Sequence, residues 1–354
     1  MTLRRNKISS FVILGLFILF FSRSFVCFAQ EEVYQLFKKG LDYLDEAKYD
    51  EASDEFIKAI ALSPRDASLY YNLGLAYHRK GRLDDAIIKY SKALEINPEY
   101  TDALYNRRLA YEERASPEQA IVDYNRIIEI DPAYAEAYSN RGVAFKDKGD
   151  LNQAIADYNK AIQINPKVAN AHYNLGLSLK AKGDFKEAIS EFSKAIKLEH
   201  GFIKAYYNRG LAYQESGDLN RALSDYDKAI LFDRNYAEAY NNRGVVYFDL
   251  GKIALAISSY NKAVELNPDF YLALNNRGNA YYSRGNIDLA ISDYSKAIEI
   301  NPLYSKAYLN RAHAYFVKQR YTSAWKDVHM AEKLGSAADS EFLLTLIQLS
   351  GQKK

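Results

Sequence analysis

The stretch YYNLGLAYHRKGRLDDAIIKYSKALEINP, residues 70–98, decides the fold because its pattern recurs along almost the whole chain. Proline marks the period most clearly, since six of the seven prolines fall on a lattice of 34 residues. When this proline is counted as the 32nd residue of a repeat, nine repeats follow one another from Val33 to Ala338 without an insertion. The lattice prolines are Pro64, Pro98, Pro132, Pro166, Pro268 and Pro302.

Small and large residues occupy fixed positions within each repeat. Position 8 is glycine in seven repeats, as in Gly74, and position 20 is alanine in all nine, from Ala52 to Ala324. Tyrosine or phenylalanine fills position 24 in the first eight repeats, as in Tyr90. This helical spacing of small and bulky residues predicts two helices that approach each other closely.

A turn separates the two predicted helices of each repeat. Position 15 is often glycine followed by Asp or Asn, and such a glycine favours the left-handed conformation that ends a helix. The Asp or Asn can then cap the next helix. Repeat 3 has no glycine here, and we expect Ser116 to be the cap, with Pro117 in the first turn and Gln119 as the capping-box partner.

On these residues the chain resembles the tetratricopeptide repeat family, whose pattern of aromatic, Leu-Gly, Tyr, Ala, Phe and Pro has this period. The resemblance implies an all-α fold, a right-handed superhelical α-solenoid of antiparallel helix pairs, in which neighbouring repeats stack to bury a continuous core. The predicted repeats are 33–66, 67–100, 101–134, 135–168, 169–202, 203–236, 237–270, 271–304 and 305–338.

The two ends of the chain lie outside the repeats. Residues 339–354 contain the apolar stretch 339–351, which we expect to form a helix, capped by Asp339 or Ser340, that covers repeat 9; a homodimerisation helix is the alternative. Residues 1–29 have basic residues, an apolar run of eleven and a small residue at Ala29, which is the layout of a signal peptide. Cleavage after Ala29 predicts an exported protein, periplasmic or secreted; an uncleaved membrane anchor or a lipid on Cys27 is the alternative.

Composition excludes several classes of function. The formal charge is +2, and four basic residues lie within 1–29, so the repeats are close to neutral, unlike a general nucleic-acid binder. The five histidines fall at unrelated repeat positions, and we find no metal-spaced cluster, nucleophile elbow or phosphate-binding loop. We therefore predict a protein that is not an enzyme and has no metal, cofactor or small-molecule substrate.

The predicted binding surface lies on the first helix of each repeat. Positions 2, 5, 6, 9, 12 and 13 share one arc of that helix, and the resemblance implies that this arc lines the concave groove. Position 6 is asparagine in eight consecutive repeats, although asparagine is unfavourable in a helix. Position 5 is tyrosine in repeats 2, 3, 5 and 6. The predicted peptide-binding residues are Asn72, Asn106, Asn140, Asn174, Asn208, Asn242, Asn276 and Asn310, with Tyr71, Tyr105, Tyr173 and Tyr207.

Two interpretations of these residues stay open. Each amide can bond the backbone of an extended peptide, and a similar asparagine row occurs in the repeat domain of the O-linked N-acetylglucosamine transferases, whose catalytic domain has no counterpart here. The amides can instead tie helix to helix, and the tyrosines can be half-buried packing. Acids outnumber bases on the arc, which favours a neutral or basic partner segment.

The predicted function is an exported scaffold that binds an extended peptide or a protein surface in its groove. The alternative is an anchored or dimeric assembly subunit of a cell-envelope or secretion complex.

Arginine at position 7 accompanies aspartate at position 23 in five repeats, as in Arg311 with Asp327, which predicts a bridge between the two helices of a repeat.

Overall fold

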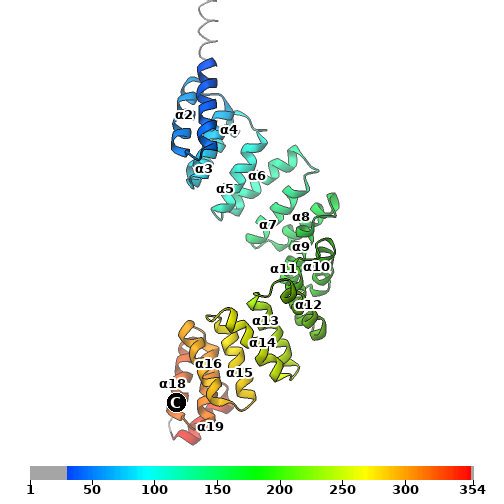
Figure 1. Cartoon of the computed structure of the whole chain (residues 1–354), viewed down its shortest axis with the longest axis vertical. Coiled ribbons are helices and arrows are strands. Elements are labelled where there is room, and N and C mark those ends of the chain that lie inside the picture. Colours follow the sequence, from blue (N-terminus) through cyan, green and yellow to red (C-terminus); the bar gives the residue numbers. More distant parts are fainter. Residues whose placement is uncertain (1–29, 352–354) are drawn as a thin grey trace, which may run out of the picture. The chain divides into compact units, whose positions relative to one another are not determined.

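The computed structural model describes residues 30–351, and every secondary-structure element in this range is a helix. The predictions for residues 1–29 lie outside the described residues. The chain divides into two compact units, Met1–Pro166 and Lys167–Lys354. Within each unit the helices form antiparallel pairs, and each pair lies beside the next pair along the chain (Figure 1). The chain is thus an all-α helical repeat solenoid, as predicted.

The first unit contains repeats 1 to 4. Its first described helix covers residues 30–45. The helices that follow are α2 (Tyr49–Leu62), α3 (Ala67–Arg79), α4 (Leu83–Ile96), α5 (Thr101–Glu113), α6 (Pro117–Ile130), α7 (Ala135–Asp147) and α8 (Leu151–Ile164).

The second unit contains the other repeats and the C-terminal helix. Its helices are α9 (Ala169–Lys182), α10 (Phe185–Leu198), α11 (Ile203–Glu215), α12 (Leu219–Phe232), α13 (Ala237–Asp249), α14 (Ile253–Leu266), α15 (Tyr271–Ser283), α16 (Ile287–Ile300), α17 (Ser305–Val317), α18 (Tyr321–Lys333) and α19 (Ser340–Ser350). No described helix is both long enough and apolar enough to cross a membrane.

The repeat core is built as the sequence predicts. The alanine at position 20 is fully buried in all nine repeats, and the ring at position 24 is buried in the first eight. A Cβ atom added to Gly74 would lie 2.7 Å from the Tyr90 ring, so glycine at position 8 is what lets this ring pack against the first helix. Close packing against this ring, rather than helix propensity, therefore explains the glycine at position 8.

Every turn within a repeat has a left-handed residue at position 15. Six of these are glycines, such as Gly149, and the others are Ala47, Ala115 and Gln319. Asp150 caps α8 by accepting the Gln153 N–H at 3.1 Å. The prediction that Ser116 caps α6 is wrong, because its side chain makes no capping hydrogen bond. The backbone of Ser116 has φ −115° and ψ 70°, against −87° and 79° at Asp150, and the serine side chain is one bond shorter than that of aspartate. Asp184 and Asn286, at the same repeat position, make no capping hydrogen bond either.

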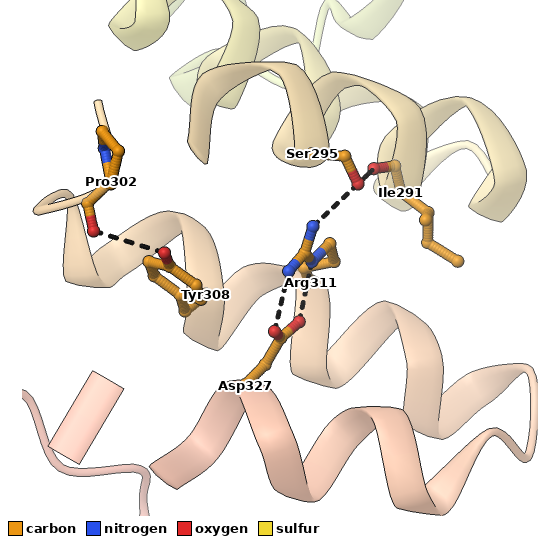
Figure 2. Close-up of polar contacts among 6 residues, drawn as sticks. All are labelled: Ile291, Ser295, Pro302, Tyr308, Arg311 and Asp327. Atoms are coloured by element: carbon orange, nitrogen blue, oxygen red, sulfur yellow. Dashed lines mark hydrogen bonds and ion pairs between the residues drawn. The ribbon is translucent and has the colours of Figure 1, made fainter. Parts of the chain in front are cut away.

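The predicted bridge between positions 7 and 23 is confirmed and extends further than expected. In repeat 9 the Nε and Nη2 atoms of Arg311 donate to both carboxylate oxygens of Asp327, and Nη1 donates to Ser295 of the preceding repeat at 2.9 Å (Figure 2). This arrangement, which we call the arginine clamp, joins three helices through one side chain. Arginine clamps with the same aspartate fork are formed by Arg107, Arg141, Arg209, Arg277 and Arg311.

The C-terminal helix α19 packs against repeat 9. Phe342 and Leu346 are buried in one cluster with Trp325 and Val328. The Asp339 side chain accepts the Phe342 N–H at 2.8 Å and so caps the helix. Leu344, on the opposite side of α19, is 68% exposed, and Leu349, near the end of the helix on the side of Phe342, is 53% exposed.

Candidate functional site: the first-helix face

In each unit the candidate surface is formed by the first helices of successive repeats, and we call it the first-helix face of that unit. Some consecutive first helices touch, namely α3 with α5 in the first unit and α9 with α11, α13 with α15 and α15 with α17 in the second. The asparagines at position 6, from Asn72 to Asn310, follow this face, and we call them the asparagine ladder. All of them are partly exposed except Asn72, which is buried.

Most members of the ladder bond to the preceding repeat. The Nδ2 atom of Asn106 donates to the Tyr71 hydroxyl at 3.1 Å, so position 6 of one repeat meets position 5 of the repeat before it. The same contact recurs in the second unit. It joins Asn208 to Tyr173 at 3.2 Å, Asn242 to Tyr207 at 2.8 Å, Asn276 to the Asn241 Oδ1 at 3.0 Å and Asn310 to the Asn275 Oδ1 at 2.9 Å.

These contacts decide which atoms of the amides remain for a partner. Asn106 Nδ2 also donates to the Asp102 carbonyl at 2.8 Å, so both amide hydrogens are used within the chain. Asn208 has the same pair of bonds, and its Oδ1 accepts from the Lys180 ammonium at 2.9 Å. Burial lowers the pKa of Lys180. At Asn106 the remaining group is therefore the Oδ1 acceptor.

Three members depart from this pattern. Asn72 donates to the Ser68 carbonyl at 2.8 Å, and the position-5 residue of the preceding repeat is Phe37, whose ring cannot accept in the same way. Asn140 makes no side-chain hydrogen bond within the described residues. Asn174, which is partly exposed, is the first ladder member of the second unit, so the repeat before it belongs to the other unit.

The predicted tyrosines are packing residues as well as ladder partners. Tyr71 lies 6.0 Å from the Tyr90 ring and 5.1 Å from the Tyr100 ring, and Tyr173 and Tyr207 have equivalent neighbours. Burial raises the pKa of Tyr71, Tyr173 and Tyr207, so their hydroxyls stay protonated. All three residues are half-buried.

Tyr105 differs because an arginine covers it. Position 8 of repeat 3 is Arg108 instead of glycine, and its guanidinium carbon lies 4.0 Å from the centre of the Tyr105 ring. Arg108 also bonds Glu112, with Nη1 and Oε2 3.0 Å apart. Tyr105 thus stacks with Arg108, and no hydrogen bond joins it to Asn140. The glycine-to-arginine change was the only signal in the sequence for this difference.

The first-helix face carries exposed acids at the predicted positions. In the first unit, Asp102, Glu112, Glu113, Glu136 and Asp147 are all exposed. In the second unit Glu238 and Asp249 are exposed at equivalent positions, but Lys204 and Lys306 are exposed at position 2 as well, so the excess of acids lies in the first unit.

Comparison with known families agrees with the repeat geometry. A model described as TPR repeat matches residues 117–149, 142–183, 176–217 and 213–251. Models described as tetratricopeptide repeat match residues 37–101, 237–270 and 271–304. The chain belongs to the tetratricopeptide repeat family. The matches leave out most of α5, the helix in which Arg108 replaces the usual glycine.

Solved structures support the same fold. A tetratricopeptide repeat protein from Parabacteroides merdae is 24% identical with a TM-score of 0.52, over 71% of this chain and 99% of that chain. The APC/C hetero-tetramer Cut9-Hcn1 gives a TM-score of 0.54 at 15% identity, over 90% of this chain and 76% of that chain. Pseudomonas aeruginosa pilF gives 0.52 at 21% identity, over 63% and 99%. A search of curated protein sequences finds no match.

Tetratricopeptide repeats are generally scaffolds for contacts between proteins rather than catalysts. The repeat surface of this chain is thus suited to binding a protein or a peptide.

Proposed function

We propose that this chain is an exported, non-enzymatic scaffold that holds an extended segment of a partner protein along the first-helix face. The observation that carries the proposal is the asparagine ladder, which is partly exposed and repeats once per 34 residues. In an ordinary helix stack, first helices lie about 8–10 Å apart and an extended chain advances about 3.3 Å per residue. One ladder residue would then meet about every third residue of the segment.

The internal bonds of the ladder specify the kind of contact. Asn106 keeps Oδ1 as its remaining group, and the Oδ1 atoms of Asn276 and Asn310 have no partner within the described residues. These oxygens accept hydrogen bonds, so they suit the backbone N–H groups of an extended segment. The exposed carboxylates of the same face favour a segment that is neutral or basic.

Export rests on residues 1–29, whose basic start, apolar run and Ala29 have the layout of a cleaved signal. The resulting location is the periplasm or the exterior. Retention of this segment would place the same repeats at a membrane instead.

One observation favours a second candidate function, an anchored or dimeric assembly subunit. Leu344 is exposed on the outer side of α19, and Leu349 is exposed near the C-terminal end of this helix. Exposed leucines at the end of a repeat array suit a symmetric contact between two copies.

Cross-linking inside the producing cell tests the proposal. A photoreactive residue would be placed at Glu136 or Lys204, which are exposed at position 2 of repeats 4 and 6. The matched controls are Lys160 and Lys228, which are exposed at position 26 of the same repeats, on the second helices. We expect one partner to be captured from the first pair and not from the controls. Equal capture from both pairs would contradict the proposal. Capture only by a photoreactive residue placed at Leu344 of α19 would contradict it as well.

A further inference from the structure

Lys180 lies at position 12 of repeat 5, towards the end of α9 on the first-helix face of the second unit. Its side chain is partly buried, and its ammonium donates to Asn208 Oδ1 of the next repeat at 2.9 Å. This bond fixes the cation at the junction between α9 and α11. Lys180 is also the one charged residue at position 12 of this unit, because the other repeats have Gln214, Phe248, Tyr282 and Phe316.

No carboxylate pairs directly with this cation in the part of the chain that the structure describes, where its hydrogen-bond partner is the neutral amide of Asn208. Glu215, which is exposed at position 13 of repeat 6, attracts Lys180 from beyond ion-pair distance. Burial outweighs this attraction and lowers the pKa of Lys180. The first-helix face of the second unit thus carries a partly desolvated positive charge that the fold itself does not neutralise by contact.

The groups around Lys180 are held in place and have already used their acceptors. Asn208 Nδ2 donates to the Tyr173 hydroxyl at 3.2 Å and to the Lys204 carbonyl at 2.9 Å, and Asn208 Oδ1 accepts from Lys180. The Tyr173 hydroxyl is protonated, because burial raises its pKa, and it accepts from Asn208, so its own hydrogen is left to be donated. Among the described residues, the groups that remain at this junction are therefore donors, the Lys180 ammonium and the Tyr173 hydroxyl.

Lys180 and Tyr173 are about two helical turns apart on α9, but their side chains converge because both contact the same amide on α11, that of Asn208. The remaining group is of the opposite kind at Asn106, where Oδ1 is left to accept. A backbone N–H therefore suits Asn106, whereas an acceptor suits the junction of repeats 5 and 6. Because one of the two donors is a cation, a carboxylate suits it better than a neutral carbonyl oxygen.

We propose that Lys180 binds a carboxylate of the partner segment on the first-helix face of the second unit. The Tyr173 hydroxyl is the neighbouring neutral donor, and Asn208 is the positioning residue that holds both groups. This inference rests on the proposed function and deepens it, because it identifies a group that the bound segment carries at repeats 5 and 6. The excess of exposed acids that favours a basic segment lies in the first unit. An acidic side chain and a free C-terminus offer the same chemistry.

Titration of the full chain with defined peptides tests the site without the partner. The probes are Ala-Glu-Ala and Ala-Gln-Ala, each blocked at both ends, and acetylated Ala-Ala-Ala with a free C-terminus, followed by NMR through the side-chain amide signals of Asn208. We expect saturable shifts with a carboxylate peptide and at least about tenfold weaker binding of Ala-Gln-Ala. The tighter of the two carboxylate peptides identifies the source of the group. Equal binding of all three peptides, or binding by none, would overturn the proposal.

The pKa of Lys180 gives a second measurement on the wild-type chain, followed through the NMR signal of its Cε carbon. A bound carboxylate stabilises the ammonium, so the lowered pKa should rise when the carboxylate peptide saturates the chain. The Ala-Gln-Ala peptide should leave it unchanged. If the pKa does not move at saturation, the carboxylate lies elsewhere and the assignment to Lys180 is wrong.

Matched variants connect the titration to Lys180. Lys180→Met keeps an unbranched stem and removes the charge, so the tenfold preference for the carboxylate peptide should be lost. The control is Lys146→Met at position 12 of repeat 4, where the lysine is also partly buried but lies 3.5 Å from the Asp147 carboxylate, and it should leave the preference unchanged. A preference that survives in Lys180→Met would refute the proposal. Cross-links from Glu136 and Lys204 would be unaffected by that result, so the two proposals fail separately.

Discussion

The asparagine ladder allows a comparison of two identical substitutions in neighbouring repeats. Asn106→Ala removes an amide that donates to Tyr71 of the preceding repeat and to the carbonyl of Asp102. Asn140→Ala removes an amide that has no side-chain hydrogen bond within the described residues. Both residues are partly exposed at position 6 of a first helix, so the change in helix propensity is the same.

The bonds give the size of the difference. Alanine is better than asparagine in a helix by up to about 0.7 kcal/mol, so Asn140→Ala should stabilise the fold by no more than this amount. Asn106→Ala gains the same term but loses two hydrogen bonds of about 0.5–1.5 kcal/mol each. It should therefore destabilise repeats 2 and 3 by roughly 0.3–3 kcal/mol.

Local stability is the quantity to measure, because a repeat array need not unfold in one step. Native-state hydrogen exchange of the α3 and α5 amides reports the free energy of opening these repeats. Tyr71→Phe completes a double-mutant cycle with Asn106→Ala, and we expect a coupling energy of about 0.5–1.5 kcal/mol. If Asn106→Ala stabilises as Asn140→Ala does, with no coupling to Tyr71, the bond between repeats contributes nothing and the reasoning fails.

Three further outcomes are expected. Intact-mass measurement of the native protein should show a chain that begins at Gln30, and a retained Met1 or a lipid-sized mass on Cys27 would contradict export as a cleaved protein. Arg277→Leu should destabilise repeats 7 and 8 by roughly 3–5 kcal/mol in hydrogen exchange, since Asp293 stays buried without its partner. The second substitution Asp293→Lys should restore most of this stability, because repeat 2 has the same pair of residue types, Leu73 at position 7 and Lys89 at position 23. Burial beside α19 lowers the pKa of His313, so the folded chain favours the neutral imidazole. The stability that this contributes is present above about pH 6.5, the ordinary pKa of histidine, and is lost as the pH falls from there towards the lowered pKa. Exchange protection of α19 should fall over this window in the wild type but not in His313→Gln.

The sequence was sufficient for most of what repeats within one unit of 34 residues, although not for the caps, since Ser116, Asp184 and Asn286 make no capping hydrogen bond. The buried alanine at position 20, the ring at position 24 and the left-handed residue at position 15 each follow from local pattern and helix spacing. The arginine clamp was half predicted: covariation of positions 7 and 23 indicated its aspartate. The third contact, such as Arg311 with Ser295, lies in the preceding repeat, and only the stacking distance between repeats brings the two side chains together.

The ladder shows the same limit. Tyr71 and Asn106 are 35 residues apart, so their hydrogen bond depends on how one repeat is set against the next. The position-5 asparagines Asn241 and Asn275 accept the same bond in the second unit, although only the tyrosines at position 5 were predicted as site residues. The pocket of about 550 Å³ that Arg108 lines between α5 and α7 was beyond sequence reasoning altogether, since the substitution at position 8 was visible but the space beside Pro117 was not.

The arginine clamp also has a consequence for how such a chain can change length in evolution. Each clamp needs only an aspartate in its own repeat and a small polar residue at position 25 of the preceding repeat, such as Ser91, Ser193 or Ser295. A duplicated 34-residue segment would bring both halves of the joint with it, and its new neighbours would already present the complementary groups. Gain or loss of whole repeats would thus leave every clamped junction chemically unchanged, so selection can adjust the length of the binding surface without rebuilding the core.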